Sequence, residues 1–124
     1  MSGFKINTDV FARLAGRISY LTARHDALVQ NIANIETPNY KAQEVQFSGY
    51  LDDQLSESAR SENTVFTPKM EEVKAPGEAK PNGNTVSMED QMAKMADNSM
   101  EYMVASEIFK KNLALLKFSL SDSK

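Results

Sequence analysis

The chain of 124 residues is long enough for one domain, and its lack of cysteine excludes disulfides, thiol catalysis and cysteine-based zinc sites. Its net charge of −3 is unevenly placed, because residues 36–101 carry 13 acidic and 6 basic side chains while both ends are mildly basic. This balance is too weak for a nucleic-acid-binding surface and suits long termini that pack together. We expect no membrane insertion and no cleaved signal peptide, because no long apolar run is present.

A heptad pattern predicts a first helix from about Thr8 to Ile35, since apolar residues recur alternately three and four positions apart. Asn7 is placed to cap its start, with Ile6 and Phe11 as a hydrophobic staple. His25 occupies the one polar position of the pattern, where we interpret it as a packed interface residue. The predicted helix–helix assembly seam on this helix consists of Phe11, Leu14, Ile18, Leu21, Leu28, Ile32 and Ile35.

The stretch NIANIETPNYK, from Asn31 to Lys41, predicts a fixed corner after this helix. Asn34 is a candidate left-handed helix stop, and Pro38 disfavours helical dihedrals at the residue before it. Asn39 tolerates positive φ better than other non-glycine residues, and Tyr40 can pack back on the helix end. An ordinary helix stop would also explain these residues.

Residues 36–87 predict an acidic, loop-rich middle region. Phe47, Leu51 and Leu55 are four apart and favour a short helical turn, while residues 64–67 favour a short extended piece. Residues 74–85 indicate a flexible loop with turns at Pro76-Gly77 and Asn82-Gly83.

The C-terminal residues 88–124 predict a second long helix, and Ser87 with Asp90 fits a capping box at its start. A second stripe of Met100, Val104, Ile108 and Leu115 widens its apolar face, which calls for a third or fourth helix. Methionines at heptad spacing favour a core or helix–helix interface over a metal or haem site. The predicted assembly seam on this helix includes Met92, Met95, Tyr102, Phe109, Leu113 and Leu116, within a repeat that runs from Met88 to Leu120.

The sequence offers little for catalysis or for a cofactor. His25 is the only side chain whose unperturbed pKa lies near neutrality, and the adjacent acidic pairs are typical of solvated charge or of helix starts. We therefore expect no enzyme, no cofactor and no metal site. The amphipathic helices fit either a structural part that self-assembles or a cytoplasmic coiled-coil adaptor or export chaperone.

The corner stretch resembles the motif NIANANTPGYK, shared by the axial proteins of the bacterial flagellum. Asn39 replaces the usual glycine and Ile35-Glu36 replaces a small polar pair, yet asparagine can still adopt positive φ, so we expect the corner to persist. The C-terminal segment, with ADNSMEY at its centre, resembles the closing helix of the proximal type of flagellar rod protein. It is less similar to the same helix in the rod protein most closely related to that type. The matching corner residues are Asn31, Ile32, Ala33, Asn34, Thr37, Pro38, Tyr40 and Lys41.

The resemblance implies an all-α fold in which long N- and C-terminal helices pair as an antiparallel, coiled-coil-like hairpin around an irregular, loop-rich middle. Its single domain would comprise an N-terminal helix (1–35), a corner and middle (36–87) and a C-terminal helix (88–124). It further implies a rod subunit of the basal body, spanning the periplasm and exported unfolded by the flagellar type III apparatus. Its partners would be copies of itself and other rod and basal-body proteins.

Overall fold

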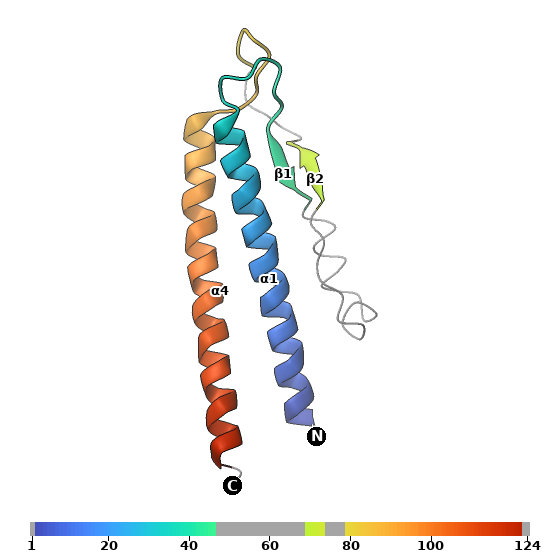
Figure 1. The fold of residues 1–124 in the computed structure, drawn as a ribbon, viewed down its shortest axis with the longest axis vertical. Coiled ribbons are helices and arrows are strands. Elements are labelled where there is room, and N and C mark those ends of the chain that lie inside the picture. Colours follow the sequence, from blue (N-terminus) through green and yellow to red (C-terminus); the bar gives the residue numbers. More distant parts are fainter. Residues whose placement is uncertain (1, 47–68, 74–78, 123–124) are drawn as a thin grey trace.

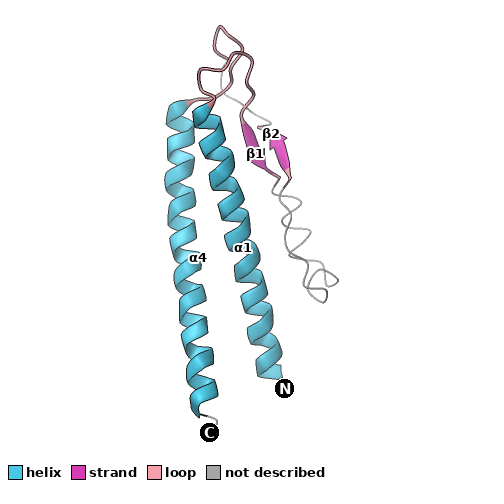
Figure 2. Ribbon diagram, in the orientation of Figure 1, coloured by secondary structure: helices cyan, strands magenta, loops and turns pink. Residues whose placement is uncertain are grey.

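The structure is a computed structural model that describes residues 2–46, 69–73 and 79–122. Two long helices, α1 (Ser2–Ala33) and α4 (Met88–Asp122), lie side by side in opposite directions, with both chain ends at the end away from the corner (Figure 1). Two short strands, β1 (Gln43–Val45) and β2 (Met70–Glu72), lie beside α1 (Figure 2). The predicted helical hairpin is confirmed, and the small sheet is an addition to the expected all-α fold.

The helix α1 begins earlier and ends slightly earlier than expected. It starts at Ser2, so Asn7 lies inside the helix and the cap predicted there is wrong. The reason lies in the pattern itself, because Phe4 precedes Phe11 by one heptad and extends the repeat backwards. The helix ends at Ala33, where the Asn34 backbone N–H donates to the Gln30 carbonyl at 3.1 Å.

The helix α4 begins as predicted, at Met88. The Ser87 hydroxyl accepts a hydrogen bond from the Asp90 backbone N–H at 3.4 Å, and the Ser87 carbonyl accepts one from the Gln91 backbone N–H at 3.0 Å. Glu89 and Asp90 lie in the first turn, where the helix dipole favours negative charge. The predicted cap therefore forms.

The two strands pair antiparallel with Gln43 opposite Glu72 and Val45 opposite Met70. Val45 is 2% exposed and belongs to the core formed with α1, so the sheet covers α1 and leaves the outer face of α4 open. The predicted helical turn at Phe47, Leu51 and Leu55, the extended piece at 64–67 and the turn at Pro76-Gly77 lie outside the described residues.

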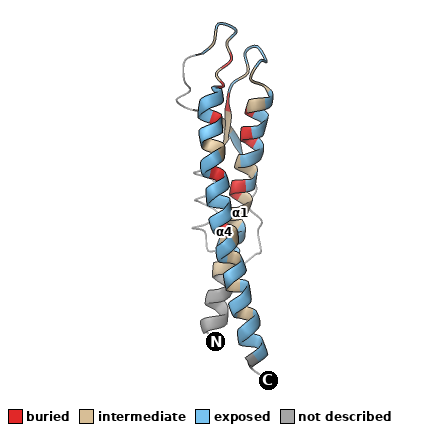
Figure 3. Cartoon of the chain, turned by 90° about the vertical axis from the view of Figure 1, so that its left-hand side faces the viewer, coloured by how far each residue is buried: buried red, intermediate tan, exposed pale blue. Residues whose placement is uncertain are grey.

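Buried side chains gather in the half of the hairpin next to the corner (Figure 3). Within the described part of the chain no third helix covers α4, so the apolar face whose width predicted further helices stays on the surface. The buried apolar residues are Tyr20, Leu21, Ala27, Leu28, Ala42, Val45, Val86 and Ala105, and the exposed apolar residues of α4 are Met88, Met92, Met100, Tyr102, Met103, Val104, Ile108, Leu113, Leu115, Phe118 and Leu120.

We predict that the free monomer is only partly folded, because helices gain most of their stability from tertiary packing and α4 packs on one side only. In amide hydrogen exchange on a dilute monomer, residues near the corner, about 20–31 and 84–105, should be the most protected. Protection should fall toward both chain ends, because residues 10–19 and 106–121 include no buried residue. Uniformly strong protection over 8–35 and 88–120 in a proven monomer would contradict this.

Candidate functional site

Asn31 is the centre of the corner, because its side chain makes hydrogen bonds to four groups while only 1% of the residue is exposed. Its amide nitrogen donates to the Gln43 carbonyl at 2.9 Å and to Gln91 Oε1 at 3.0 Å. Its amide oxygen accepts from the Gln43 backbone N–H at 3.0 Å and from the Tyr40 hydroxyl at 3.1 Å. A side-chain amide offers two donors and two acceptor positions, so Asn31 is fully satisfied. The end of α1 is thereby tied to the corner, to β1 and to α4.

Asn34 and Thr37 are held by each other and by the segment that leads into α4. The Thr37 hydroxyl donates to Asn34 Oδ1 at 3.1 Å. Asn84, which is fully buried, donates through Nδ2 to the carbonyls of Asn34 at 2.8 Å and Thr37 at 2.7 Å. Asn39 is the only non-glycine residue with positive φ in the described part of the chain, so the left-handed stop predicted at Asn34 is wrong. Side-chain hydrogen bonds end the helix instead.

Asn39 adopts the predicted positive φ, at 62°. Its backbone N–H donates to the Asn82 carbonyl at 2.9 Å, which brings it against Gly83. Gly83 itself has a φ of 83°, and a Cβ there would overlap Asn39 Oδ1 and lie 3.4 Å from the Asn39 Cα. Position 83 therefore requires glycine both for its dihedral angle and for the close approach of Asn39.

Tyr40 and Lys41 complete the contact between the corner and the segment before α4. The Tyr40 carbonyl accepts from the Thr85 backbone N–H at 3.1 Å, and the Ala42 backbone N–H donates to Thr85 Oγ1 at 2.9 Å. Lys41 Nζ donates to the Gly83 carbonyl at 2.8 Å. Burial raises the pKa of Tyr40, and its hydroxyl is the group that donates to Asn31 Oδ1.

Sequence reasoning missed the contact between residues 79–86 and the corner. The turn at Asn82-Gly83 is confirmed, since the Gly83 backbone N–H donates to the Lys80 carbonyl at 2.8 Å. The flexible loop expected over 74–85 is wrong for 79–85, because hydrogen bonds hold that segment against the corner. Lys80 Nζ adds one to the Ile35 carbonyl at 3.2 Å. The turn signal at Asn82-Gly83 was visible, but nothing local showed which segment it meets.

The predicted seam on α1 faces the interior of the hairpin to different depths. Leu21 and Leu28 are 0% and 2% exposed. Phe11 packs edge-to-face on Phe109 of α4, with ring centroids 5.3 Å apart. The remaining seam residues are half-buried: Phe11, Leu14, Ile18, Ile32 and Ile35.

On α4 the structure buries a different set of residues from the one the heptad count selected. Met95, Phe109 and Leu116 are half-buried, but Met92, Tyr102 and Leu113 are exposed. The positions deepest against α1 are instead Gln91, Asn98 and Ala105, which are 2%, 2% and 5% exposed. Met92, which is 56% exposed, therefore lies largely outside the contact between the two helices of one chain, and a contact of Met92 or Leu113 with another subunit stays a prediction.

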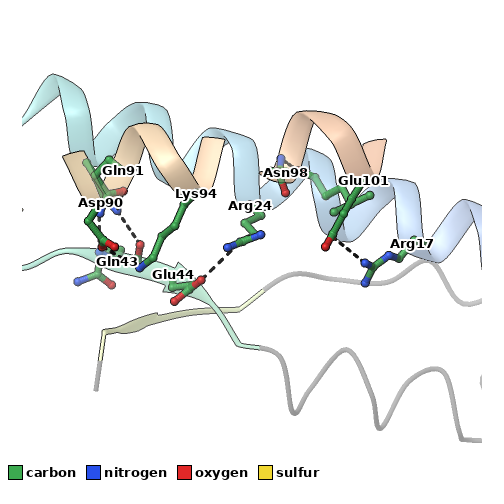
Figure 4. Close-up of polar contacts among 11 residues, drawn as sticks. Arg17, Arg24, Gln43, Glu44, Asp90, Gln91, Lys94, Asn98 and Glu101 are labelled. Atoms are coloured by element: carbon green, nitrogen blue, oxygen red, sulfur yellow. Dashed lines mark hydrogen bonds and ion pairs between the residues drawn. The ribbon is translucent and has the colours of Figure 1, made fainter. Parts of the chain in front are cut away.

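Two ion pairs tie α1 to its neighbours on either side (Figure 4). Arg17 contacts Glu101 of α4 at 2.7 Å, and Arg24 contacts Glu44 of β1 at 3.4 Å. Burial raises the pKa of Tyr20, which lies among these charges, and the positive charge of Arg24 opposes that shift. Partly exposed pairs of this kind are worth about 0–1 kcal/mol each, so they orient the helices more than they stabilise them.

His25 is exposed and lines a shallow groove between the helices, together with Leu21, Asn98, Tyr102 and Met103. The packing expected for His25 is therefore absent within one chain and stays a prediction for an assembly. Across the described ranges, no group of three or more His, Asp or Glu side chains is placed to hold a metal ion. Neither described helix has the sustained apolarity that a membrane crossing requires.

Comparison with known proteins points to one kind of protein. Over 119 residues the chain is 29% identical to the flagellar basal body rod protein FlgB of Bacillus subtilis, covering 90% of this chain and 92% of that protein. It is 28% identical over 98 residues to FlgB of Escherichia coli and 28% identical over 95 residues to FlgB of Yersinia enterocolitica. The coverage is 66% of this chain and 71% of the protein in the first case, and 64% and 69% in the second. No family model matches the chain.

The chain is homologous to the flagellar basal body rod protein FlgB. The homology confirms the resemblance first seen in the corner stretch and the C-terminal segment. Through its hydrogen bonds, the site described above joins the end of α1 to the corner, to β1 and to the start of α4.

We predict that Asn39→Gly is tolerated and that Asn39→Val impairs assembly. Glycine adopts positive φ more easily than asparagine, whereas a β-branched residue at φ 62° is strained by about 1–3 kcal/mol. Pro38→Ala, in the same corner, should be milder because it loosens the chain without forbidding the conformation. Motility in soft agar, with secretion measured separately, reads out the three variants. Full swimming with Asn39→Val would show that the left-handed conformation is not needed.

We also predict that His25→Gln and His25→Leu both retain motility. The side chain is exposed, so its replacement leaves the packing of the hairpin unchanged. Motility of each variant is compared with that of the parent strain at equal levels of exported protein. Loss of motility in both variants with export intact would indicate a specific polar role for His25.

Proposed function

We propose that this chain is a proximal rod subunit of the bacterial flagellar basal body, which assembles with copies of itself and with other rod proteins through its terminal helices. The observation that supports this most strongly is the homology to FlgB, which extends over 90% of the chain in the case of Bacillus subtilis. The proposal places the protein in the rod, within the periplasm, after export as an unfolded chain by the flagellar type III apparatus.

The outer face of α4 supports an assembly role. Met100, Val104, Ile108 and Leu115 are 66%, 60%, 44% and 66% exposed and follow one side of the helix. Full burial of one such side chain is worth about 1.5–3 kcal/mol, so burial of the row against a neighbouring subunit would contribute strongly to the free energy of association. Monomeric soluble proteins rarely leave so continuous an apolar surface open.

The corner supports the same role from the other end of the hairpin. Its hydrogen bonds to residues 80–86 turn the chain out of the helical layer and return it at the start of α4. The two helices then lie antiparallel, with β1 and β2 beside α1 (Figure 2). In the proposed rod, this geometry makes the terminal helices the part that neighbouring subunits share.

We predict that Leu113→Asp prevents incorporation into the basal body while export continues. Leu113 is 36% exposed, so part of its side chain lies on the surface of the hairpin, where a neighbouring subunit can contact it. A charge in a subunit interface must be desolvated or must push the helices apart. The mutant protein should therefore be found outside the cytoplasm without a complete rod. Cell fractionation, with blots for this protein and for hook protein, provides the measurement.

The matched control is Ala114→Asp, which places the same charge at the next residue. Ala114 is exposed and shares its side of α4 with Glu107, Lys110 and Lys117, so incorporation should persist. A cytoplasmic adaptor or export chaperone would behave differently, because it would stay inside the cell and its client would fail to leave. Wild-type protein confined to the cytoplasm and absent from purified basal bodies would overturn the rod proposal.

A further inference from the structure

The helix α4 carries two alternative heptad seams that share one row of residues. The shared row consists of Met95, Tyr102, Phe109 and Leu116. Either of two flanking rows can complete a seam with it. We define the inner row as Gln91, Asn98, Ala105 and Asn112, and the outer row as Met92, Ser99, Ser106 and Leu113.

Apolarity favours the outer row, yet the structure buries three members of the inner row, Gln91, Asn98 and Ala105, and leaves Asn112 half-buried. Met92 and Leu113 would contribute two large apolar side chains to a contact with α1, whereas the inner row offers three amides and one alanine. Nevertheless Gln91 and Asn98 are each 2% exposed, while Met92 is 56% exposed. Some interaction other than apolar burial therefore selects the rotation of α4 about its axis.

Hydrogen bonds to α1 supply that interaction at two positions of the inner row. Gln91 Oε1 accepts from Asn31 Nδ2 at 3.0 Å, and Asn98 Nδ2 donates to the Leu21 carbonyl at 2.9 Å. Asn112 differs, because its Nδ2 donates at 3.0 Å to the Ile108 carbonyl of its own helix, and it makes no hydrogen bond to the described side chains of α1, which begin at Val10. Rotating α4 onto the outer row would break the first two bonds and leave buried groups unpaired.

Among the described residues, Asn98 uses only the donor side of its amide in this arrangement. Its Oδ1 is buried and has no hydrogen-bond partner among the described residues. A buried polar atom without a partner is unfavourable, and a leucine at the same position would avoid the penalty. In coiled coils, a buried asparagine trades stability for a defined register and pairing.

We propose that Gln91 and Asn98 fix the rotation of α4 against α1 and thereby keep the outer row on the surface. They are positioning residues, since they act through the orientation of the helix and not by contact with a neighbouring subunit. The use of that surface for assembly rests on the proposed rod function, but the rotation itself is a property of the single chain. Without these two residues, α4 would turn toward the outer row and withdraw Met92 and Leu113 from the surface.

The absence of cysteine from the sequence allows a direct test with single thiols at Ala105, in the inner row, and at Met92, in the outer row. Alkylation rates of the full chain are measured with and without urea. With no other change, Ala105→Cys should react at least about tenfold more slowly than Met92→Cys, because residue 105 is buried and residue 92 is exposed. A tenfold difference corresponds to a free energy of about 1.4 kcal/mol for the local opening that exposes the buried thiol. Equal rates at the two positions would overturn the assigned rotation.

The decisive variant combines Gln91→Ala and Asn98→Ala with Ser99→Leu and Ser106→Leu, which make the outer row apolar throughout and so keep the helices paired. The order of reactivity should invert, with the thiol at 92 becoming the protected one. The two leucine substitutions without the alanines should retain the original order, as should Asn112→Ala. A retained order in the four-fold variant, or reaction of both thiols at the rate of the urea-unfolded chain, would overturn the proposal.

Basal-body incorporation of the same variants separates this inference from the proposed function. If the four-fold variant inverts the labelling and is exported but not incorporated, both stand. If the wild-type chain is absent from basal bodies while labelling inverts, the rod function fails and the rotation inference stands. If labelling does not invert while the wild-type chain is incorporated, the rotation inference fails and the rod function stands.

Discussion

The four hydrogen bonds of the Asn31 side chain are the constraint on which the rest of the structure depends. They join the last turn of α1 to the corner through Tyr40, to β1 through Gln43 and to α4 through Gln91. Asparagine is suited to this place because its amide offers two donors and two acceptor positions. An aspartate would leave two of the four groups without a hydrogen bond, and a leucine would leave all four without one. The residues that resemble the axial motif are mostly polar for the same reason, since the corner is held by hydrogen bonds more than by apolar packing.

The sequence was sufficient to predict the features that depend on neighbouring residues along the chain. The cap at Ser87 depends on atoms within one helical turn, and the positive φ of Asn39 follows from its own backbone preference after a proline. The length of both helices follows from heptad repetition over many turns, although extending the count back to Phe4 would have placed the start of α1 correctly. In each case, neighbours along the chain supply the decisive interaction.

The features that escaped prediction depend on contacts between distant segments. Strands β1 and β2 have three residues each and form only because residues 43–45 meet residues 70–72 against α1. The segment that includes Asn84 becomes ordered only when it meets the corner. The rotation of α4 was predicted wrongly for a related reason. Counting apolar residues takes no account of the hydrogen bond that Gln91 accepts from Asn31, which lies 60 residues earlier in the sequence.

The rotation of α4 about its axis has two consequences: polar side chains face α1 near the corner, and apolar side chains are exposed further along the helix. Gln91 and Asn98 replace apolar contacts at the positions nearest α1, so the hairpin buries less than its composition allows. The apolar side chains that are not used inside, among them Met100 and Leu115, remain available outside. Burial of an open apolar face against a neighbour adds to the free energy of folding, so in the proposed rod the neighbouring subunits would add to the stability that the corner provides. For a subunit that is proposed to travel as an unfolded chain, this couples completion of the fold to the place where its neighbours are found.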